Sequence, residues 1–207
     1  MKRRPIVVGI IGGVASGKSE VANQFVLRGA SRINADELGH LLLKNDPNIQ
    51  KSVEKLFGPT ILNESKQIDR SKIASMVFGS DEQSKSLLEG LEAILHPAIR
   101  RMTDERLAML RNQSDLLMIV LDAPLLIEAG WASLCDEIVF VDTPFQKRQQ
   151  WAAQRGWPPE ELARREATQL SLNEKRAVAT RVVFNDGDIK ELQNEIDELA
   201  KELRVES

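Results

Sequence analysis

Apolar residues alternate along the chain between short continuous runs and longer stretches with helical spacing. The short runs are rich in β-branched residues and are bounded by Gly, Pro, Asp or Asn, which predicts buried strands. They cover residues 6–11, 31–33, 116–121, 138–141 and 182–184. Helical patterns cover residues 20–27, 87–110, 144–155, 159–170 and 189–203. This alternation predicts an α/β fold with a parallel sheet flanked by helices.

Residues 38–111 contain no convincing strand pattern. We therefore interpret this stretch as a helical insertion between two strands. A connection of this length is unusual and commonly has a role, such as forming one wall of a substrate site. The chain has 207 residues, of which 42% are hydrophobic, so we expect one domain over residues 1–207 rather than several.

One motif carries a specific chemistry. Residues 12–19 have the sequence Gly-Gly-Val-Ala-Ser-Gly-Lys-Ser, which fits the phosphate-binding pattern G-x-x-x-x-G-K-S between a predicted strand and a predicted helix. Backbone N–H groups of such a loop and the helix dipole behind it face phosphate oxygens. Lys18 would reach the β- and γ-phosphates, and the Ser19 hydroxyl would bind Mg²⁺. The alternative is a glycine-rich turn without a ligand.

The nucleotide-binding residues expected here occupy the loop and the first turn of the helix. They are Gly13, Val14, Ala15, Ser16, Gly17, Lys18, Ser19 and Glu20.

Charge and composition exclude several partners. The formal net charge of −3 gives the whole molecule no positive field for a nucleic acid backbone, although a local basic pocket for a small anion stays open. Cys135 is the single cysteine and forms no intrachain disulfide, so a reducing cytoplasm is the simplest location. The basic start followed by an apolar run is similar to a secretory signal, but that run is needed as the strand before the phosphate loop. No apolar stretch reaches the roughly 18 residues of a membrane span. We expect neither a membrane nor an obligate protein partner.

Asp36 follows the short predicted strand at residues 31–33. It should lie at the carboxyl edge of the sheet, where open α/β sheets bind ligands. A carboxylate there could accept the proton of an acceptor hydroxyl during phosphoryl transfer, or it could simply cap the following helix. Residues 36–39 also have the D-x-x-G spacing of a GTPase, but the chain lacks the Asn-Lys-x-Asp element that selects guanine.

Asp122 ends the apolar run at residues 116–121. This is the position of a carboxylate that holds Mg²⁺ or its water ligands, although a strand-end turn former fits it equally well. Lysine and arginine are frequent over residues 146–181. We expect most of these cations to be solvated and one or two to cover the triphosphate, where a guanidinium stabilises charge in the transition state.

The chain resembles the dephospho-coenzyme A kinase family over nearly its whole length. The phosphate loop and Asn34-Ala35-Asp36 match the first two family elements. The later elements follow in order: Ile-Asp-Arg at 68–70, Val-Phe at 77–78, Leu-Glu at 91–92, His-Pro at 96–97, Pro-Leu-Leu-Ile-Glu at 124–128, Val-Asp at 141–142, Gln-Arg at 154–155, Glu-Lys-Arg at 174–176 and Asn-Asp-Gly at 185–187. Each piece is short, but the ordered set is specific.

The resemblance implies a P-loop kinase fold. It also implies an enzyme that transfers the γ-phosphoryl group of ATP, with Mg²⁺, to the 3′-hydroxyl of 3′-dephospho-coenzyme A. Asp36 is then the catalytic base, residues 38–111 bind the acceptor, and residues 144–180 form a lid. Asn185 and Gly187 would lie near the adenine.

Further site residues are expected beside these. Arg155 joins Lys18 and Asp36 in the catalytic set, with Arg148 as its alternative because Trp151 stands where many family members have arginine. On the acceptor side we expect Arg70, His96, Leu125 and Glu128, for each of which an ordinary packing or pairing role is the alternative. Asn34 stands where the family has aspartate.

Two other functions stay open at the level of sequence. Another small-molecule or nucleoside monophosphate kinase would share the loop and the lid and differ only in the acceptor. A non-catalytic nucleotide switch would bind ATP or GTP and transfer nothing, which Asp36 and the basic lid argue against.

Overall fold

The computed structural model describes residues 4–79 and 81–206, which divide into two compact units. The first, here called the sheet unit, consists of the chain up to Asn34 together with the chain from Arg106 onward. The second, the helical unit, comprises Ala35–Glu105. Each unit is described by itself.

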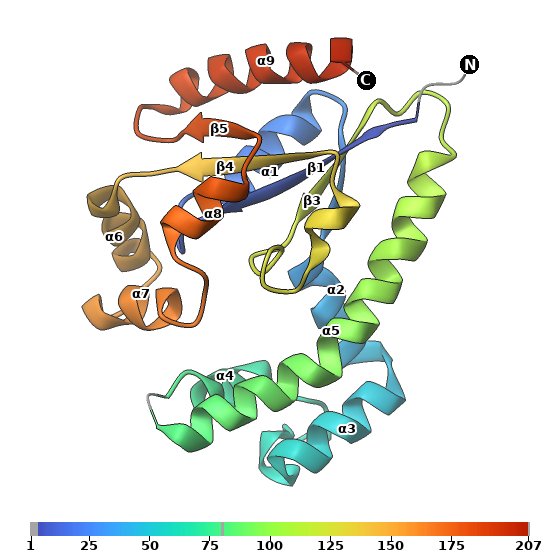
Figure 1. Cartoon of the computed structure of the whole chain (residues 1–207). Coiled ribbons are helices and arrows are strands. Elements are labelled where there is room, and N and C mark those ends of the chain that lie inside the picture. The colour runs from blue at the N-terminus through green and yellow to red at the C-terminus, as the bar shows by residue number, and fades with distance from the viewer. Residues whose placement is uncertain (1–3, 80, 207) are drawn as a thin grey trace. The chain divides into compact units, whose positions relative to one another are not determined.

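A five-stranded parallel sheet forms the centre of the sheet unit (Figure 1). Its strands are β1 (Ile6–Gly12), β2 (Ser31–Asn34), β3 (Met118–Asp122), β4 (Glu137–Asp142) and β5 (Arg181–Phe184). The strand order is β2-β3-β1-β4-β5, and every neighbouring pair is parallel. All five strands predicted from the apolar runs are confirmed, and so is the α/β class.

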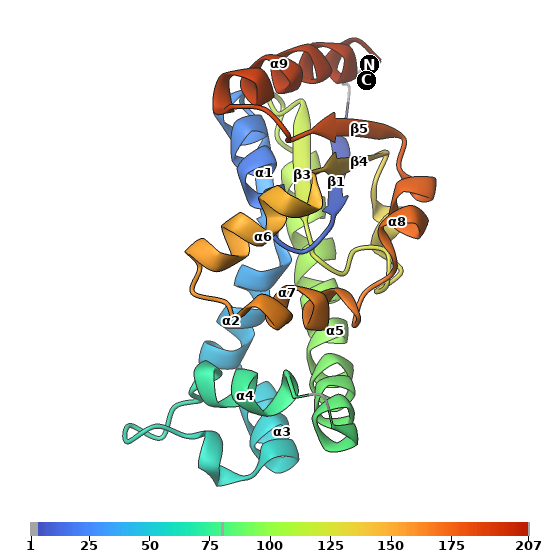
Figure 2. The same cartoon turned by 90° about the vertical axis from the view of Figure 1, so that its left-hand side faces the viewer.

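The alternation of side chains along β1 assigns the two faces of the sheet. Ile6, Val8 and Ile10 belong to one apolar cluster with residues of α1 (Lys18–Leu27) and α9 (Ile189–Glu206). A Cβ atom placed on Gly9 would lie on the opposite face, against Leu126 and Cys135. Figure 2 shows α1 on one side of the sheet and α8 on the other. Both faces are thus covered, as the continuous apolar strands require.

The remaining helices of the sheet unit follow β3 and β4. They are η2 (Trp131–Leu134), α6 (Phe145–Gln154), α7 (Pro159–Glu166) and α8 (Leu172–Val178). The single helix predicted at residues 159–170 was too long, because α7 ends at Glu166. Ser171 and Glu174 form a capping box that begins the separate helix α8.

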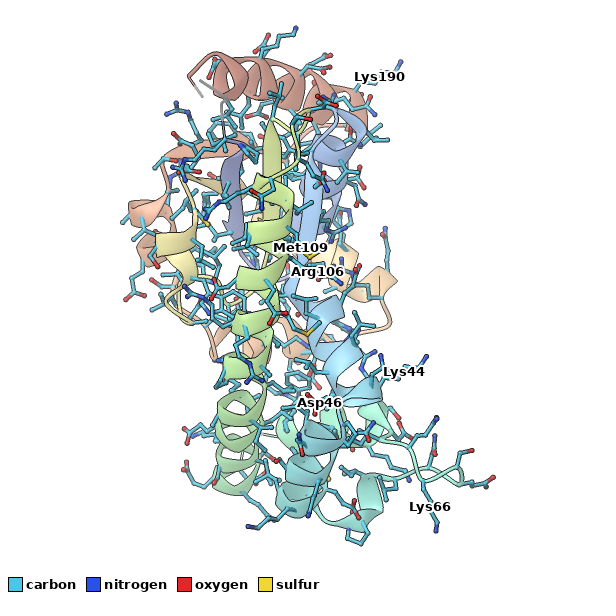
Figure 3. All side chains as sticks on the ribbon, turned by 90° about the vertical axis from the view of Figure 1, so that its right-hand side faces the viewer. Lys44, Asp46, Lys66, Arg106, Met109 and Lys190 are labelled. Carbon is cyan, nitrogen blue, oxygen red and sulfur yellow. The ribbon has the colours of Figure 1, made fainter. Side chains whose placement is uncertain are left out.

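The helical unit has its own core. Its elements are α2 (Ala35–Asn45), α3 (Pro47–Phe57), η1 (Pro59–Ile61), α4 (Arg70–Val77) and α5 (Glu82–Arg111), the last of which continues into the sheet unit. Val53, Phe57, Ile61 and Ile73 are buried together. Asp46, labelled in Figure 3, begins α3 by accepting hydrogen bonds from the backbone N–H groups of residues 48 and 49.

None of the helices within residues 4–79 and 81–206 combines the length and the apolarity that crossing a membrane requires.

Candidate active site

The phosphate loop lies between the end of β1 at Gly12 and the start of α1 at Lys18. Gly17 is the N-cap residue of α1 and has φ 85°, in the left-handed region, and no side chain caps the helix there. No side chain therefore occupies the start of α1, and phosphate oxygens are the usual acceptors at such a helix start.

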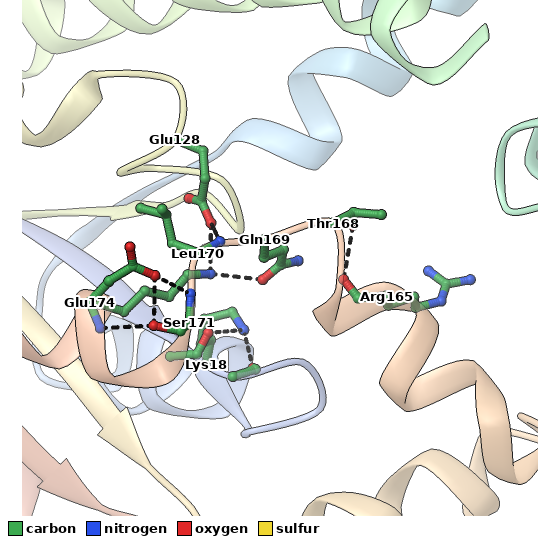
Figure 4. A network of polar contacts seen from close by, with 11 residues as sticks. Lys18, Glu128, Arg165, Thr168, Gln169, Leu170, Ser171 and Glu174 are labelled. Carbon is green, nitrogen blue, oxygen red and sulfur yellow. Dashed lines mark hydrogen bonds and ion pairs between the residues drawn. The ribbon is translucent and has the colours of Figure 1, made fainter. Parts of the chain in front are cut away.

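Lys18 folds back over its own loop. Its Nζ donates to the carbonyl oxygen of Gly13 at 2.6 Å and to that of Gly12 at 3.3 Å (Figure 4). Ser19 and Glu20 follow in the first turn of α1, where Ser19 is exposed and the Glu20 carboxylate accepts a hydrogen bond from Gln24. The ammonium group thus lies at the loop whose backbone would hold phosphates.

The carbonyl oxygen of Ser16 is held by two side chains from the carboxyl ends of other strands. Asn185, just after β5, donates to it at 3.0 Å, and Thr143, just after β4, donates at 2.8 Å. The backbone N–H of Asn185 in turn donates to the carbonyl oxygen of Asp142. Asn185, expected near the adenine, is therefore a neighbour of the phosphate loop, and Thr143 is a loop-positioning residue that the sequence did not indicate.

Two other groups lie in this neighbourhood. The carbonyl oxygen of Gly187 accepts a hydrogen bond from Lys147 at 2.5 Å. The hydroxyl oxygen of Ser16 is buried and has no hydrogen-bond partner among the residues that the structure describes. A buried hydroxyl in that state is costly unless a ligand or water satisfies it.

Arg148 on α6 is only 3% exposed and lies against the phosphate loop. Its Nε donates to the carbonyl oxygen of Thr143 at 3.2 Å and its Nη1 to that of Val14 at 3.4 Å. The same Nη1 forms an ion pair with Glu166 at the end of α7. Its burial is visible in the sequence only as helical spacing, since Arg148 and the buried Ala152 are four positions apart on one face of α6.

Arg155 occupies a different environment. It is exposed at the C-cap of α6, and its guanidinium lies 5.8 Å from the centre of the Trp157 ring. The two candidate lid arginines therefore differ: Arg148 is fixed at the loop, whereas Arg155 is open to solvent.

Asp122 ends β3 and is 4% exposed. Its Oδ2 forms an ion pair with Arg32 on β2, which also donates to Asn23 at 2.8 Å. Asn34 is the register partner of Asp122 in the adjacent strand. Arg32 was not among the expected site residues, although its position two residues before Asn34 places it on the same face of β2.

Leu125 and Glu128 follow β3 in the sheet unit. The Oε1 atom of Glu128 accepts a hydrogen bond from the backbone N–H of Leu170 at 3.0 Å and lies 3.0 Å from Nζ of Lys175. Lys175 is 1% exposed and is thus an exception among the lysines and arginines of residues 146–181, most of which were expected to be solvated. In the sequence, the only indication of this burial is that Lys175 follows Leu172 by three positions, which places both residues on one face of α8.

The other expected residues belong to the helical unit. Asp36 lies in the first turn of α2 and Arg70 begins α4. Both affect His40, which lies one turn after Asp36. Burial and the charge of Arg70 lower the pKa of His40, and the charge of Asp36 offsets part of this shift. His40 was not an expected site residue, but it shares a helix face with Asp36 through the i, i+4 spacing.

His96 lies within α5, directly before Pro97. The helical unit also has a hollow of about 480 Å³, lined by Leu41, Leu42, Asn45, Asp46, Pro47, Asn48 and Met102. Arg70 and His96 lie outside this lining.

Known proteins with similar sequences and folds identify the family. A family model described as dephospho-CoA kinase matches residues 6–191. The dephospho-CoA kinase of Rhodopirellula baltica is 37% identical over 199 residues, covering 96% of this chain and 91% of the relative. The crystal structure of TT1252 from Thermus thermophilus has a TM-score of 0.77 and 32% identity, covering 97% of this chain and 99% of its own. A shikimate kinase from Acinetobacter baumannii, 10% identical with a TM-score of 0.52 over 98% of this chain and 95% of its own, shares the fold alone.

These matches cover almost the whole chain, including the phosphate loop and both units. They confirm the resemblance found in the ordered motifs and the P-loop kinase fold. The chain belongs to the dephospho-CoA kinase family, ATP-dependent kinases that carry out the final step of coenzyme A synthesis.

Proposed function

We propose that this chain transfers the γ-phosphoryl group of ATP to the 3′-hydroxyl of 3′-dephospho-coenzyme A, with the residue roles given below. The observation that carries the proposal is the phosphate loop, which meets an uncapped helix start with Lys18 against it. In this class of reaction positioning and charge stabilisation do most of the work, because the transition state is loose.

The nucleotide is held by the loop and by residues beside it. The loop residues Gly13, Val14, Ala15, Ser16 and Gly17, with Lys18, Ser19 and Glu20 of the first turn, surround the phosphates, and backbone N–H groups of the loop donate to them. Lys18 exchanges the carbonyl oxygens of Gly12 and Gly13 for phosphate oxygens. Asn185 and Gly187 line the adenine, a role supported by the bond from Asn185 to Ser16.

The oxygen donors Ser19 and Asp122 fit Mg²⁺, which binds through one or two protein oxygens plus water and phosphate oxygens. Arg32 holds Oδ2 of Asp122, so Oδ1 is the atom assigned to the ion or its waters. When bound, the ion neutralises charge on the phosphates and draws them into one geometry.

Asp36 acts as the catalytic base. Its carboxylate accepts the proton of the acceptor hydroxyl as the new oxygen–phosphorus bond forms and the bond to ADP breaks. Arg70 and His96 in the region 38–111 bind the acceptor together with Leu125, whereas Glu128, expected beside Leu125, is bonded to Leu170 and Lys175. The action of both Asp36 and Arg70 on His40 supports a shared electrostatic environment for these groups.

Arg155 in the lid 144–180 stabilises charge on the transferring phosphoryl group. Its exposed position is compatible with a residue that approaches the phosphates when ATP is bound. We further propose that the enzyme works in the cytoplasm on small molecules, without a nucleic acid, membrane or obligate protein partner. The net charge of −3 supports the exclusion of nucleic acid.

The test is release of ADP by the purified protein with Mg-ATP, in the presence and absence of 3′-dephospho-coenzyme A. The expected result is stimulated release together with a product one phosphoryl group heavier by mass spectrometry. ATP binding without transfer to this acceptor would overturn the proposed substrate.

A further inference from the structure

Lys175 is an unusual lysine because its side chain is only 2% exposed. Burying an ammonium group costs several kcal/mol unless a charge and hydrogen-bond acceptors compensate it. Its Nζ lies 3.0 Å from Oε1 of Glu128 and donates to Oε1 of Gln169 at 2.7 Å. Lys175 therefore joins the loop after β3 to the segment that precedes α8.

Glu128 also binds the backbone of this segment. The same Oε1 accepts the backbone N–H of Leu170 at 3.0 Å, so one carboxylate oxygen holds both the start of the segment and the lysine on α8 (Figure 4). Ser171 then caps α8, and its carbonyl oxygen accepts the backbone N–H of Lys175 at 3.0 Å. Residues 169–175 are thus fixed by side-chain and backbone bonds at several positions.

The residue that this arrangement orients is Leu172. A Cβ atom placed on Gly13 would lie 3.1 Å from Cδ2 of Leu172, so the leucine packs directly over the phosphate loop. Gly13 is also the residue whose carbonyl oxygen holds Lys18 at 2.6 Å. Glu128 and Lys175 are therefore linked to the loop and its lysine through the bonded start of α8, which carries Leu172.

We propose that Lys175 and Glu128 are positioning residues for nucleotide binding: their buried ion pair holds Leu172 against Gly13 and so maintains the loop in its phosphate-binding conformation. This gives Glu128 a role through the loop rather than on the acceptor. The inference rests on the proposed ATP-dependent function.

Lys175→Met, which keeps the length of the side chain and removes its charge, tests the pair. We expect the Kd for the non-hydrolysable analogue β,γ-imido-ATP, measured by calorimetry, and the KM for ATP to rise by about tenfold. The KM for 3′-dephospho-coenzyme A should change by less than about twofold, because the acceptor does not depend on this loop. Lys201→Met makes the same change at an exposed position of α9 and should leave both constants unaltered.

Two milder variants cover the case in which Lys175→Met fails to fold. Glu128→Gln keeps an oxygen for the N–H of Leu170 and should weaken analogue binding in the same direction by a smaller factor. Leu172→Ala leaves the ion pair intact, and it should reproduce the loss of ATP affinity if the pair acts through this leucine.

Three results would overturn the proposal. One is unchanged nucleotide affinity in folded variants whose unfolding temperature alone is lowered, since this would make the pair only structural. Another is a rise in the KM for the acceptor alone in Glu128→Gln, which would place Glu128 at the acceptor. The third is unchanged affinity in Leu172→Ala. Failure of the wild type to phosphorylate 3′-dephospho-coenzyme A would instead count against the proposed substrate, because analogue binding needs no acceptor.

Discussion

The side-chain amide of Asn185 donates a hydrogen bond to the carbonyl oxygen of Ser16 at 3.0 Å, although 169 positions separate the two residues. This bond joins the end of β5 to the centre of the phosphate loop. The side-chain amide of Asn185 occupies the space beside Gly17 that a larger residue would fill, since a Cβ atom at Gly17 would overlap Nδ2 of Asn185. The loop conformation is therefore fixed from outside as well as by its own glycines.

Gly17→Ala should weaken nucleotide binding more than it destabilises the fold. An alanine there adds strain of about 1–2 kcal/mol at φ 85° and also displaces Asn185. Gly130→Ala is the matched control, because Gly130 has φ 71° but no atom within 4 Å of its added Cβ. We expect a rise of about tenfold or more in the Kd for ATP with the first variant alone. Equal ATP affinity in the two variants would show that the contact with Asn185 is unimportant for binding.

Lys18→Ala and Asp36→Asn separate phosphate binding from base catalysis. Both should lower kcat by about 100-fold or more, since one removes charge stabilisation and the other removes the proton acceptor. Only Lys18→Ala should strongly weaken ATP binding, measured by calorimetry, because Lys18 alone of the two belongs to the phosphate loop. An equal loss of ATP affinity in both would argue against the assigned roles.

The parts of the site that were predictable from sequence are local ones. Residues 12–19 specify their loop through glycine positions and the neighbouring strand and helix, so spacing alone identifies them. The five strands were equally local, because each is a short apolar run. Lys175 is the opposite case: its burial depends on Glu128, 47 positions away, reached through the tertiary fold. No spacing rule along one helix or strand carries that information.

Helix boundaries in the lid show the same limit. The apolar and charged pattern over residues 159–170 suited one helix, but α7 ends at Glu166 and α8 starts after Ser171. The capping box of Ser171 and Glu174 was present in the sequence as a Ser-x-x-Glu signal. Glu166, in turn, is tied to Arg148 on α6, which a one-dimensional pattern does not reveal.

Arg148→Gln and Arg155→Gln should give different kinetic losses. Arg148 is fixed by the carbonyl oxygens of Thr143 and Val14 and by Glu166, so its loss should raise the KM for ATP by about tenfold and lower the unfolding temperature. Arg155 is exposed, so its replacement should leave the unfolding temperature unchanged and lower kcat by about 100-fold.

The control for this pair is Arg111→Gln, the same change at an exposed position at the end of α5. It should alter neither kcat nor KM. An unchanged kcat in Arg155→Gln, together with a large drop in kcat in Arg148→Gln, would transfer the transition-state role to Arg148.

Cys135 should be nearly inert in the native protein at pH 8. Burial, and secondarily the charge of Asp136, raise the pKa of its thiol to about 12. Its Sγ also lies 2.6 Å from where a Cβ of Gly9 would be, so it packs tightly on β1. The thiolate is the reactive form, and an unfolded thiol has a pKa of about 8.5. Alkylation by iodoacetamide should therefore be about 1,000-fold slower in the native than in the denatured protein. Native alkylation at the rate of a free thiol would contradict this environment.

The same shift predicts an alkaline loss of stability. Because the folded pKa is raised, the contribution of Cys135 to the free energy of unfolding is fully present below the unfolded pKa of about 8.5 and is lost as the pH rises towards about 12, by at most about 5 kcal/mol. The chain has no tyrosine, so fewer other groups titrate in this range. Denaturant unfolding of the wild type and of Cys135→Ala at several pH values isolates the effect. The difference between the two proteins should be constant from pH 7 to about 8.5 and should then shift against the wild type. A difference that stays constant up to pH 10.5 would mean that the native thiol ionises as readily as the unfolded one.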